Sequence, residues 1–322
     1  MSTEAHVAEI SSINALSPEI IKSIERLHPA GSTPQLNQFQ ENRKEERSLQ
    51  HPGYNHSIIL QFKDKTEWVI KFPLNAMTCP SLMAQKVTSE VVTMKWIKKN
   101  TKIPVPQVHG FDPNGKSDWN STRRPCIVMD KVPGRSISEK QWRHMKEPQQ
   151  KKVIAQIADI IATLASHPFD RIGSLFEDKT GSISVGPLVA EVSNSYLQGR
   201  EHLDLFLAPD SPYRSATHYY LDLAAMRLLY EASTSPVMNE EFVHTWICRS
   251  LLASCVINEY DHGPFVLSHG NLSRKNVLFN SELQITGVIN WEWSRTVPLQ
   301  AISNLPPFIS HLSKVENLAH AE

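Results

Sequence analysis

Three asparagines within residues 267–297, LSHGNLSRKNVLFNSELQITGVINWEWSRTV, could take part in chemistry. They are Asn271, in a His-Gly-Asn loop, followed by Asn276 and Asn290. An asparagine amide offers a carbonyl oxygen that accepts hydrogen bonds, but it has no charge and no basic group at neutral pH. Such side chains can orient a hydroxyl group or contact a metal ion, yet they cannot remove a proton.

The residues around these asparagines predict a β-hairpin. An apolar run at 277–279 and a β-rich run at 284–289 are separated by the polar turn 280–282, a pattern typical of two antiparallel strands. A hairpin brings the residues at its open end together, so Asn276 and Asn290 should be neighbours. Taken alone, the pattern also fits a surface hairpin with ordinary turn asparagines.

The pattern H-G-x-L-x-x-x-N, the hairpin and the following G-V-I-x-W-E-W together resemble the aminoglycoside phosphotransferase family, in its fungal-type branch. The resemblance implies an α+β, bilobal protein-kinase-like fold with a small β-rich N-lobe and a mainly helical C-lobe. It also implies ATP and Mg²⁺ as cofactors. In kinase-type sites a loop aspartate accepts the hydroxyl proton, while an asparagine and a second aspartate hold Mg²⁺.

Asparagine replaces both of these aspartates in this chain. The resemblance makes Asn271 the catalytic position, and Asn276 and Asn290 the metal and nucleotide positions. Losing a general base costs about 10²- to 10⁴-fold in rate. Losing the second carboxylate removes an electrostatic attraction to Mg²⁺. As a scale for that loss, two opposite unit charges about 4 Å apart attract each other by about 4 kcal/mol at an effective dielectric near 20. Little or no turnover is therefore expected.

The first half of the chain supplies further candidate nucleotide contacts. Residues 57–62 and 68–72 are expected strands joined by a polar turn, with Lys71 where the family places its phosphate-binding lysine. Residues 81–99 predict a helix with Glu90 on its apolar face. An unpaired buried carboxylate is costly, which favours a Lys71–Glu90 pair over a glutamate that reaches out to water.

The expected strand at 126–132 resembles the linker between the lobes. In the family the adenine hydrogen-bonds to the backbone here, so the resemblance implies cofactor contacts at Met129, Asp130 and Lys131. Residues 51–56, HPGYNH, occupy the place of the phosphate-covering loop but contain a single glycine. A β-turn is the simpler interpretation of that segment, because a phosphate cradle relies on several exposed N–H groups.

Length and composition exclude several classes of protein. A chain of 322 residues suits two lobes, and its 33 basic and 33 acidic residues leave no charge footprint for nucleic acid. No apolar run reaches membrane-spanning length, and the start MSTEAHVAE is not a secretory signal. The four cysteines lack metal-like spacing, which suits a reducing compartment. We therefore expect a cytoplasmic protein that binds neither membrane nor nucleic acid.

The chain divides into three expected parts: a polar N-terminal extension at 1–50 with a helix at 17–27, an N-lobe at 51–130 and a C-lobe at 131–322. Members of the family usually continue further beyond the hairpin. The C-lobe is therefore expected to be short, which weakens the expectation of substrate binding.

Two functions fit these observations. The favoured one is a pseudokinase that keeps the fold, binds ATP weakly and acts through a protein partner. The alternative is an active O-phosphotransferase that moves the γ-phosphate of ATP to a small hydroxylated molecule. Substrate choice lies in C-lobe surfaces for which the sequence offers no motif.

Overall fold

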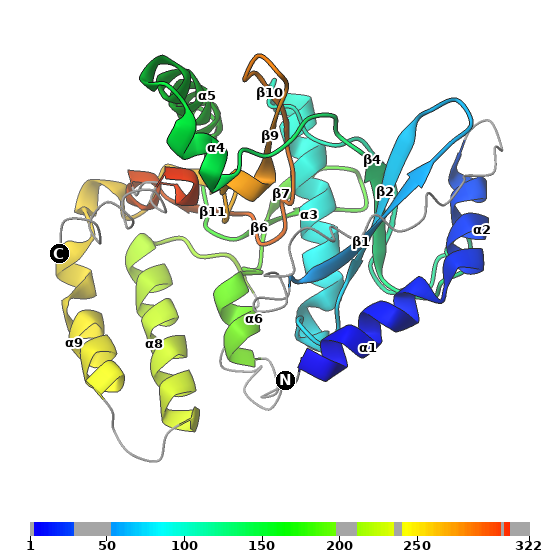
Figure 1. Cartoon of the computed structure of the whole chain (residues 1–322). Helices are drawn as coiled ribbons and strands as arrows, with labels where there is room; N and C mark the ends of the chain where they lie inside the picture. The colour runs from blue at the N-terminus through cyan, green and yellow to red at the C-terminus, as the bar shows by residue number, and fades with distance from the viewer. Residues whose placement is uncertain (1–2, 29–52, 198–210, 235–239, 304–305, 310–322) are drawn as a thin grey trace.

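The chain folds into two lobes (Figure 1). The computed structural model describes residues 3–28, 53–197, 211–234, 240–303 and 306–309. The smaller N-lobe is built on a β-sheet and the larger C-lobe is mainly helical, so the predicted α+β, bilobal kinase-like class is confirmed.

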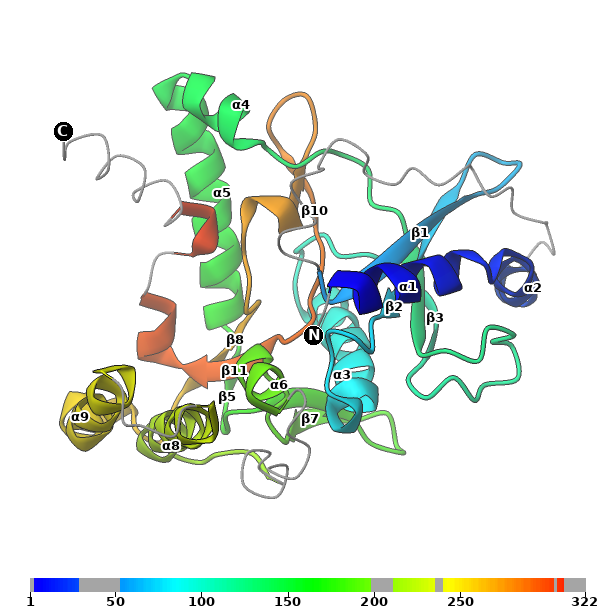
Figure 2. The same ribbon diagram turned by 60° about the horizontal axis from the view of Figure 1, so that its bottom comes forward.

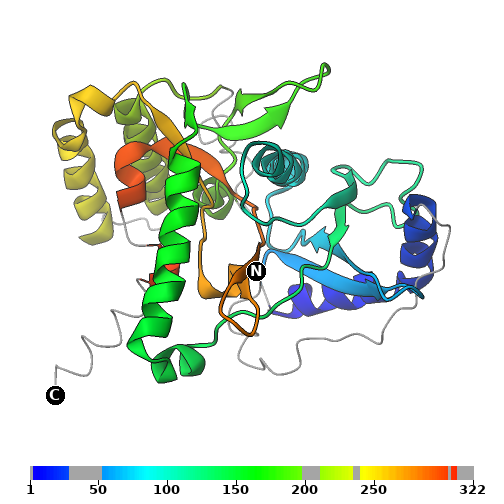
Figure 3. The same cartoon turned by 90° about the horizontal axis from the view of Figure 1, so that it is seen from above.

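The N-lobe contains a four-stranded sheet in which neighbouring strands are antiparallel. Its strand order is β1-β2-β4-β3, from β1 (Asn55–Gln61), β2 (Glu67–Pro73), β3 (Val108–Asp112) and β4 (Cys126–Asp130). Strands β1 and β2 form the predicted hairpin, with Lys65 at positive φ in its turn. Helix α3 (Pro80–Asn100) lies between this sheet and the C-lobe (Figure 3).

Helix α3 is the element that positions the polar residues of the N-lobe. It begins at Pro80, whose fixed φ suits the first turn, and ends before Thr101, whose backbone is extended. Its apolar side chains Val91 and Met94 are buried, as the sequence predicted. Two charged side chains on the same helix, Lys86 and Glu90, are also buried and therefore need partners.

Two N-terminal helices, α1 (Thr3–Asn14) and α2 (Ser17–Leu27), pack against the N-lobe sheet (Figure 2). Their side chains Ile13, Ile20 and Ile24 are fully buried in one hydrophobic cluster with the strands. The segment predicted to be a polar extension thus contributes to the N-lobe core. Residues 29–50 of the predicted extension lie outside the described residues.

The described residues of the C-lobe form helices and three small sheets. Its helices are α4 (Glu139–His144), α5 (Glu147–Ala165), α6 (Glu191–Leu197), α8 (Ala216–Thr234), α9 (Glu240–Cys255) and the short 3-10 helices η3 (Asn258–Tyr260), η4 (Arg274–Asn276) and η5 (Leu299–Ser303). Its sheets are β11-β8-β5, β10-β9 and β6-β7. Their strands are β5 (Pro168–Phe169), β6 (Ser174–Glu177), β7 (Ile183–Gly186), β8 (Phe265–Ser268), β9 (Val277–Phe279), β10 (Ile285–Val288) and β11 (Arg295–Pro298).

Strands β9 and β10 form the predicted hairpin of the asparagine segment. They pair antiparallel, with Val277 opposite Val288 at the open end. Beyond that end, the Ile289 amide donates to the Asn276 carbonyl at 2.9 Å. Asn276 and Asn290 are therefore held close together, as the sequence predicted.

One hydrophobic cluster joins the two lobes. It includes Val91 and Met94 of α3, Ile157 of α5, and Phe279 and Trp291 of the hairpin segment. Because α3 and the hairpin share this core, the polar residues that they carry are fixed relative to each other. In the described residues, no helix combines the length and apolar character that crossing a membrane requires.

Candidate active site

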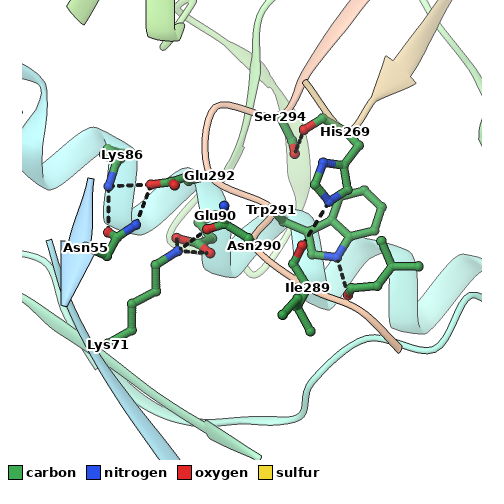
Figure 4. A network of polar contacts seen from close by, with 11 residues as sticks. Asn55, Lys71, Lys86, Glu90, His269, Ile289, Asn290, Trp291, Glu292 and Ser294 are labelled. Atoms are coloured by element: carbon green, nitrogen blue, oxygen red, sulfur yellow. Dashed lines mark hydrogen bonds and ion pairs between the residues drawn. The ribbon is translucent and has the colours of Figure 1, made fainter. Parts of the chain in front are cut away.

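Lys71 and Glu90 form a buried ion pair at the boundary between the lobes (Figure 4). The Lys71 Nζ lies 2.7 Å from Glu90 Oε1 and 2.9 Å from Oε2. Burial alone would lower the pKa of Lys71, but the charges of Glu90 and then Glu292 outweigh it and raise that pKa. Lys71 therefore stays protonated, and the pair expected from the sequence is present.

Asn290 completes the coordination of the Lys71 ammonium. Lys71 Nζ donates to Asn290 Oδ1 at 2.8 Å. Asn290 has a φ of 64°, a left-handed conformation that asparagine tolerates better than most residues. The bond links strand β2 of the N-lobe to the loop after β10 in the C-lobe, and a neutral amide oxygen faces the cation.

A second buried network lies beside the first, and sequence reasoning missed it. Lys86 Nζ lies 2.7 Å from Glu292 Oε2 and donates to Asn55 Oδ1 at 2.9 Å. Asn55 Nδ2 in turn donates to Glu292 Oε2 at 2.8 Å. These three side chains, which we call the interlobe triad, join β1 and α3 to the C-lobe (Figure 4). The available signal was that Lys86 precedes Glu90 by one helical turn, on the same buried face.

Burial acts on both charged members of the interlobe triad, and it lowers the pKa of Lys86 although the charge of Glu292 opposes that shift. Burial would raise the pKa of Glu292, but the positive charges of Lys86 and Lys71 and the hydrogen bonds from Lys86 and Asn55 lower it to about 2. The Lys86 side chain is 1% exposed and that of Glu292 is 7% exposed. Each charge therefore depends on the other, because little of either side chain is exposed to water.

Aromatic side chains close over the interlobe triad. Lys86 Nζ lies 5.2 Å from the Trp293 ring centroid, and the Tyr54 and Trp293 rings meet edge to face at 5.5 Å. The Tyr54 hydroxyl donates to Glu191 Oε1 at 2.8 Å. Burial, and next the negative charge of Glu191, raise the pKa of Tyr54, so its hydroxyl stays protonated. Tyr54 and Asn55 of the HPGYNH segment thus contribute direct contacts between the lobes.

His269 fixes the loop that carries Asn271. The Asn271 amide donates to His269 Nδ1 at 3.3 Å, so the ring proton is on Nε2, which donates to the Ile289 carbonyl at 3.0 Å. Burial lowers the pKa of His269 from 6.5 to about 4. The imidazole is therefore neutral at physiological pH and acts as a brace between the loop and the hairpin.

This depressed pKa predicts a specific loss of stability in acid. Between pH 6.5 and 4 the unfolded chain binds a proton at His269 that the folded chain does not, so stability falls as pH falls. Between pH 6.5 and 5 the loss from this residue should be about 2 kcal/mol. Urea unfolding at several pH values measures it. In His269→Gln, which does not titrate, this part of the slope should vanish, whereas exposed His144→Gln should keep it. Equal slopes in both variants would contradict the assignment.

The two loop asparagines occupy different environments. Asn276 is buried and its Nδ2 donates to the Asn271 carbonyl at 2.8 Å. Asn271 is exposed, and its side chain has no hydrogen bond to any residue that the structure describes. Asn271, Asn276 and Asn290 converge as predicted, and only Asn271 is free to meet a substrate.

A family comparison agrees with this arrangement. Residues 55–299, more than half of the chain, match the model of the phosphotransferase enzyme family. The chain belongs to that family. The match begins at β1 and ends within η5, so it contains both networks that surround Lys71 and Lys86.

Two curated relatives of this phosphotransferase-family chain are fungal proteins, in agreement with the predicted fungal-type branch. It is 30% identical over 132 residues to altered inheritance of mitochondria protein 9, mitochondrial, of Meyerozyma guilliermondii, covering 40% of this chain and 21% of the relative. It is 28% identical over 131 residues to a subtelomeric hrmA-associated cluster protein of Aspergillus fumigatus, covering 41% of this chain and 24% of the relative. Less than a quarter of each relative is therefore matched.

Solved phosphotransferases show distant similarity. Macrolide 2′-phosphotransferase type I has a TM-score of 0.48 and 14% identity, covering 95% of this chain and 82% of its own. An aminoglycoside phosphotransferase solved with GDP and kanamycin has a TM-score of 0.44 and 17% identity, covering 75% of this chain and 65% of its own. Neither similarity identifies a substrate for this chain.

The expected adenine contacts are partly occupied in this phosphotransferase-family chain. The amide of Asp130 donates to the Gln107 carbonyl at 2.9 Å, and that of Lys131 donates to the Glu67 carbonyl at 2.9 Å. These two N–H groups therefore already donate to backbone carbonyls of the protein and are not available to a bound base. Met129 lies in β4 and is buried beside them. A base bound here would have to use the remaining backbone groups of the linker.

The residues at the expected metal position do not fit Mg²⁺ well. Magnesium prefers carboxylate oxygens. Asn290 offers an amide oxygen that already accepts from Lys71, and the nearby Glu292 carboxylate is paired with Lys86. The described part of the chain contains no cluster of three or more acidic, histidine or cysteine side chains that could hold a metal. Asn276 alone cannot replace the missing carboxylate.

Proposed function

We propose that this phosphotransferase-family chain is a catalytically impaired pseudokinase that retains weak ATP binding through Lys71. The observation that carries the proposal is the 2.8 Å bond from Lys71 Nζ to the neutral Asn290 amide. Lys71 with Glu90 and Lys86 with Glu292 form two pairs whose charges cancel. No uncompensated carboxylate of the described residues remains there to attract the metal of Mg²⁺·ATP.

The geometry also supports weak binding of the phosphate groups. A phosphate can approach Lys71 only in competition with Glu90 and Asn290, whose oxygens already accept hydrogen bonds from the Lys71 ammonium. Asn271 can orient a hydroxyl but cannot accept its proton. Function would then depend on the folded surface and a protein partner more than on turnover. The cytoplasmic location remains a prediction.

Nucleotide binding tests the proposal. ATP should stabilise the chain weakly in a thermal-shift titration, and Mg²⁺ should change the shift little. Lys71→Met should abolish the shift, because it removes the cation that meets the phosphates, while Lys95→Met, at the exposed pair with Glu177, should not. Strong stabilisation that requires Mg²⁺, together with ATP consumption lost in Lys71→Ala, would overturn the pseudokinase assignment.

One observation favours the alternative of an active small-molecule O-phosphotransferase. The Lys71–Glu90 pair is intact, and phosphoryl transfer depends largely on positioning and electrostatics. A slow reaction could proceed without a base at Asn271. Steady ADP release in the presence of a hydroxylated acceptor, and absent without it, would support this alternative.

A further inference from the structure

A cavity of about 560 Å³ lies in the C-lobe beside the catalytic loop. Gly270 and Leu272, which flank the exposed Asn271, form part of its wall. The rest of the wall comes mainly from α5, α8, β8, β11 and η5. A cavity of this size lies in the range of small-molecule sites, which is about 300–1,000 Å³.

The cavity is lined by both apolar and polar side chains. Leu164 and Leu267 are among the apolar side chains, whereas Tyr219, Tyr220 and Arg295 provide polar groups. The two tyrosine rings lie 5.1 Å apart, centroid to centroid. Burial and the neighbouring Tyr219 raise the pKa of Tyr220, so its hydroxyl remains a neutral donor.

Arg295 is the one charged side chain among the described residues that line the cavity. His269, which also lines the cavity, has its pKa lowered by burial to about 4 and is neutral at physiological pH. The described wall contains no aspartate or glutamate. The lining therefore has a positive charge, which attracts an anion and repels a polycation.

The guanidinium of Arg295 has unused hydrogen-bonding capacity. Its Nη1 donates to the Trp293 carbonyl at 3.2 Å, and its Nε lies 3.5 Å from the Tyr219 hydroxyl oxygen. No carboxylate of the described residues lies within ion-pair distance of it. An arginine has five N–H donors in a planar fork, so several can still bind an oxyanion.

We propose that this cavity binds a small organic anion with an apolar body, whose carboxylate or phosphate group pairs with Arg295. The apolar body packs against apolar lining residues such as Leu164 and Leu267, and the tyrosine hydroxyls add hydrogen bonds to the anionic group. The site goes beyond the proposed nucleotide site and needs neither ATP nor turnover. A failure here would leave the pseudokinase proposal untouched.

Matched ligands test the proposal on the full chain. Calorimetry and thermal shift would compare 3-phenylpropionate with its uncharged amide, 3-phenylpropanamide, and would include phenyl phosphate as the second oxyanion. We expect an oxyanion to bind at least tenfold more tightly than the amide. The arm that binds better, carboxylate or phosphate, identifies the anionic group.

Variants then assign the binding to Arg295. Arg295→Gln should weaken the oxyanion about tenfold to hundredfold, because a charged hydrogen bond is lost. Arg295→Lys should retain part of the binding, and Arg143→Gln, an exposed arginine on α4, should change nothing. If Arg295→Gln does not fold, two other measurements test the proposal. They are the oxyanion affinity of Tyr220→Phe and the ratio of oxyanion affinity to amide affinity in the unaltered chain.

Four results would each overturn the proposal. They are equal binding of acid and amide, unchanged oxyanion affinity in folded Arg295→Gln, no oxyanion binding at millimolar concentration, and preferential binding of a polycation such as kanamycin.

Discussion

Lys86→Met is expected to lower the free energy of unfolding by about 3–5 kcal/mol, because it leaves the Glu292 carboxylate buried without its charged partner. Both charges of the interlobe triad are buried. Without Lys86, Glu292 keeps only the hydrogen bond from Asn55 and the charge of Lys71, which is already paired with Glu90. Urea unfolding at neutral pH measures the change. Methionine is chosen because it fills most of the volume of the lysine stem without its charge.

Two variants serve as controls for this result. Lys95→Met removes the cation of the exposed pair with Glu177 and should cost only about 0–1 kcal/mol. Lys86→Met combined with Glu292→Leu should recover much of the lost stability, since both buried charges are then absent. The interpretation is wrong if Lys86→Met unfolds no more easily than Lys95→Met.

Asn271→Asp combined with Asn290→Asp is expected to raise the rate of ATP turnover by about 10²- to 10⁴-fold, the usual contribution of a general base. The first substitution supplies that base from an exposed position. The second places a carboxylate where the neutral amide now faces Lys71, and binding of ATP should become dependent on Mg²⁺. Release of ADP and a thermal shift with and without Mg²⁺ measure the two effects.

A substitution in the same hairpin provides the matched control. Asn280→Asp keeps the acceptor oxygen that binds the turn amides of Glu282 and Gln284, and should leave turnover unchanged. Adding Lys71→Met to the double variant should abolish the gain. An unaltered chain that already turns over ATP as fast as the double variant would contradict the impaired assignment.

The local parts of the site could be predicted because they depend on short-range patterns. The hairpin follows from two β-rich runs and a turn, and it places Asn276 beside Asn290. The inward position of Glu90 follows from helical periodicity, and burial of its charge then requires a cation such as Lys71. The family resemblance predicted the functional roles of these residues, whereas strand and helix patterns predicted where their side chains lie.

The N-terminal helices show a limit of reasoning from polarity. The first fifty residues are polar on average, which predicts a polar N-terminal extension. Only Ile13, Ile20, Ile24 and a few other apolar side chains of the described helices face the sheet, and these three are fully buried. A narrow apolar stripe is enough to dock a helix, although it barely changes the composition of the segment.

By itself the sequence determined the fold class, the hairpin and the replacement of both aspartates by asparagine. Only the tertiary structure decided that Asn290 accepts from Lys71, that Lys86 and Glu292 neutralise each other, and that Arg295 lines a cavity whose described wall has no carboxylate. The physical reason is that secondary structure follows from neighbours along the chain. Which charges meet across the lobes depends instead on how those elements pack. The effect of a buried charge on stability and on ligand binding is therefore set by the partner that packing gives it.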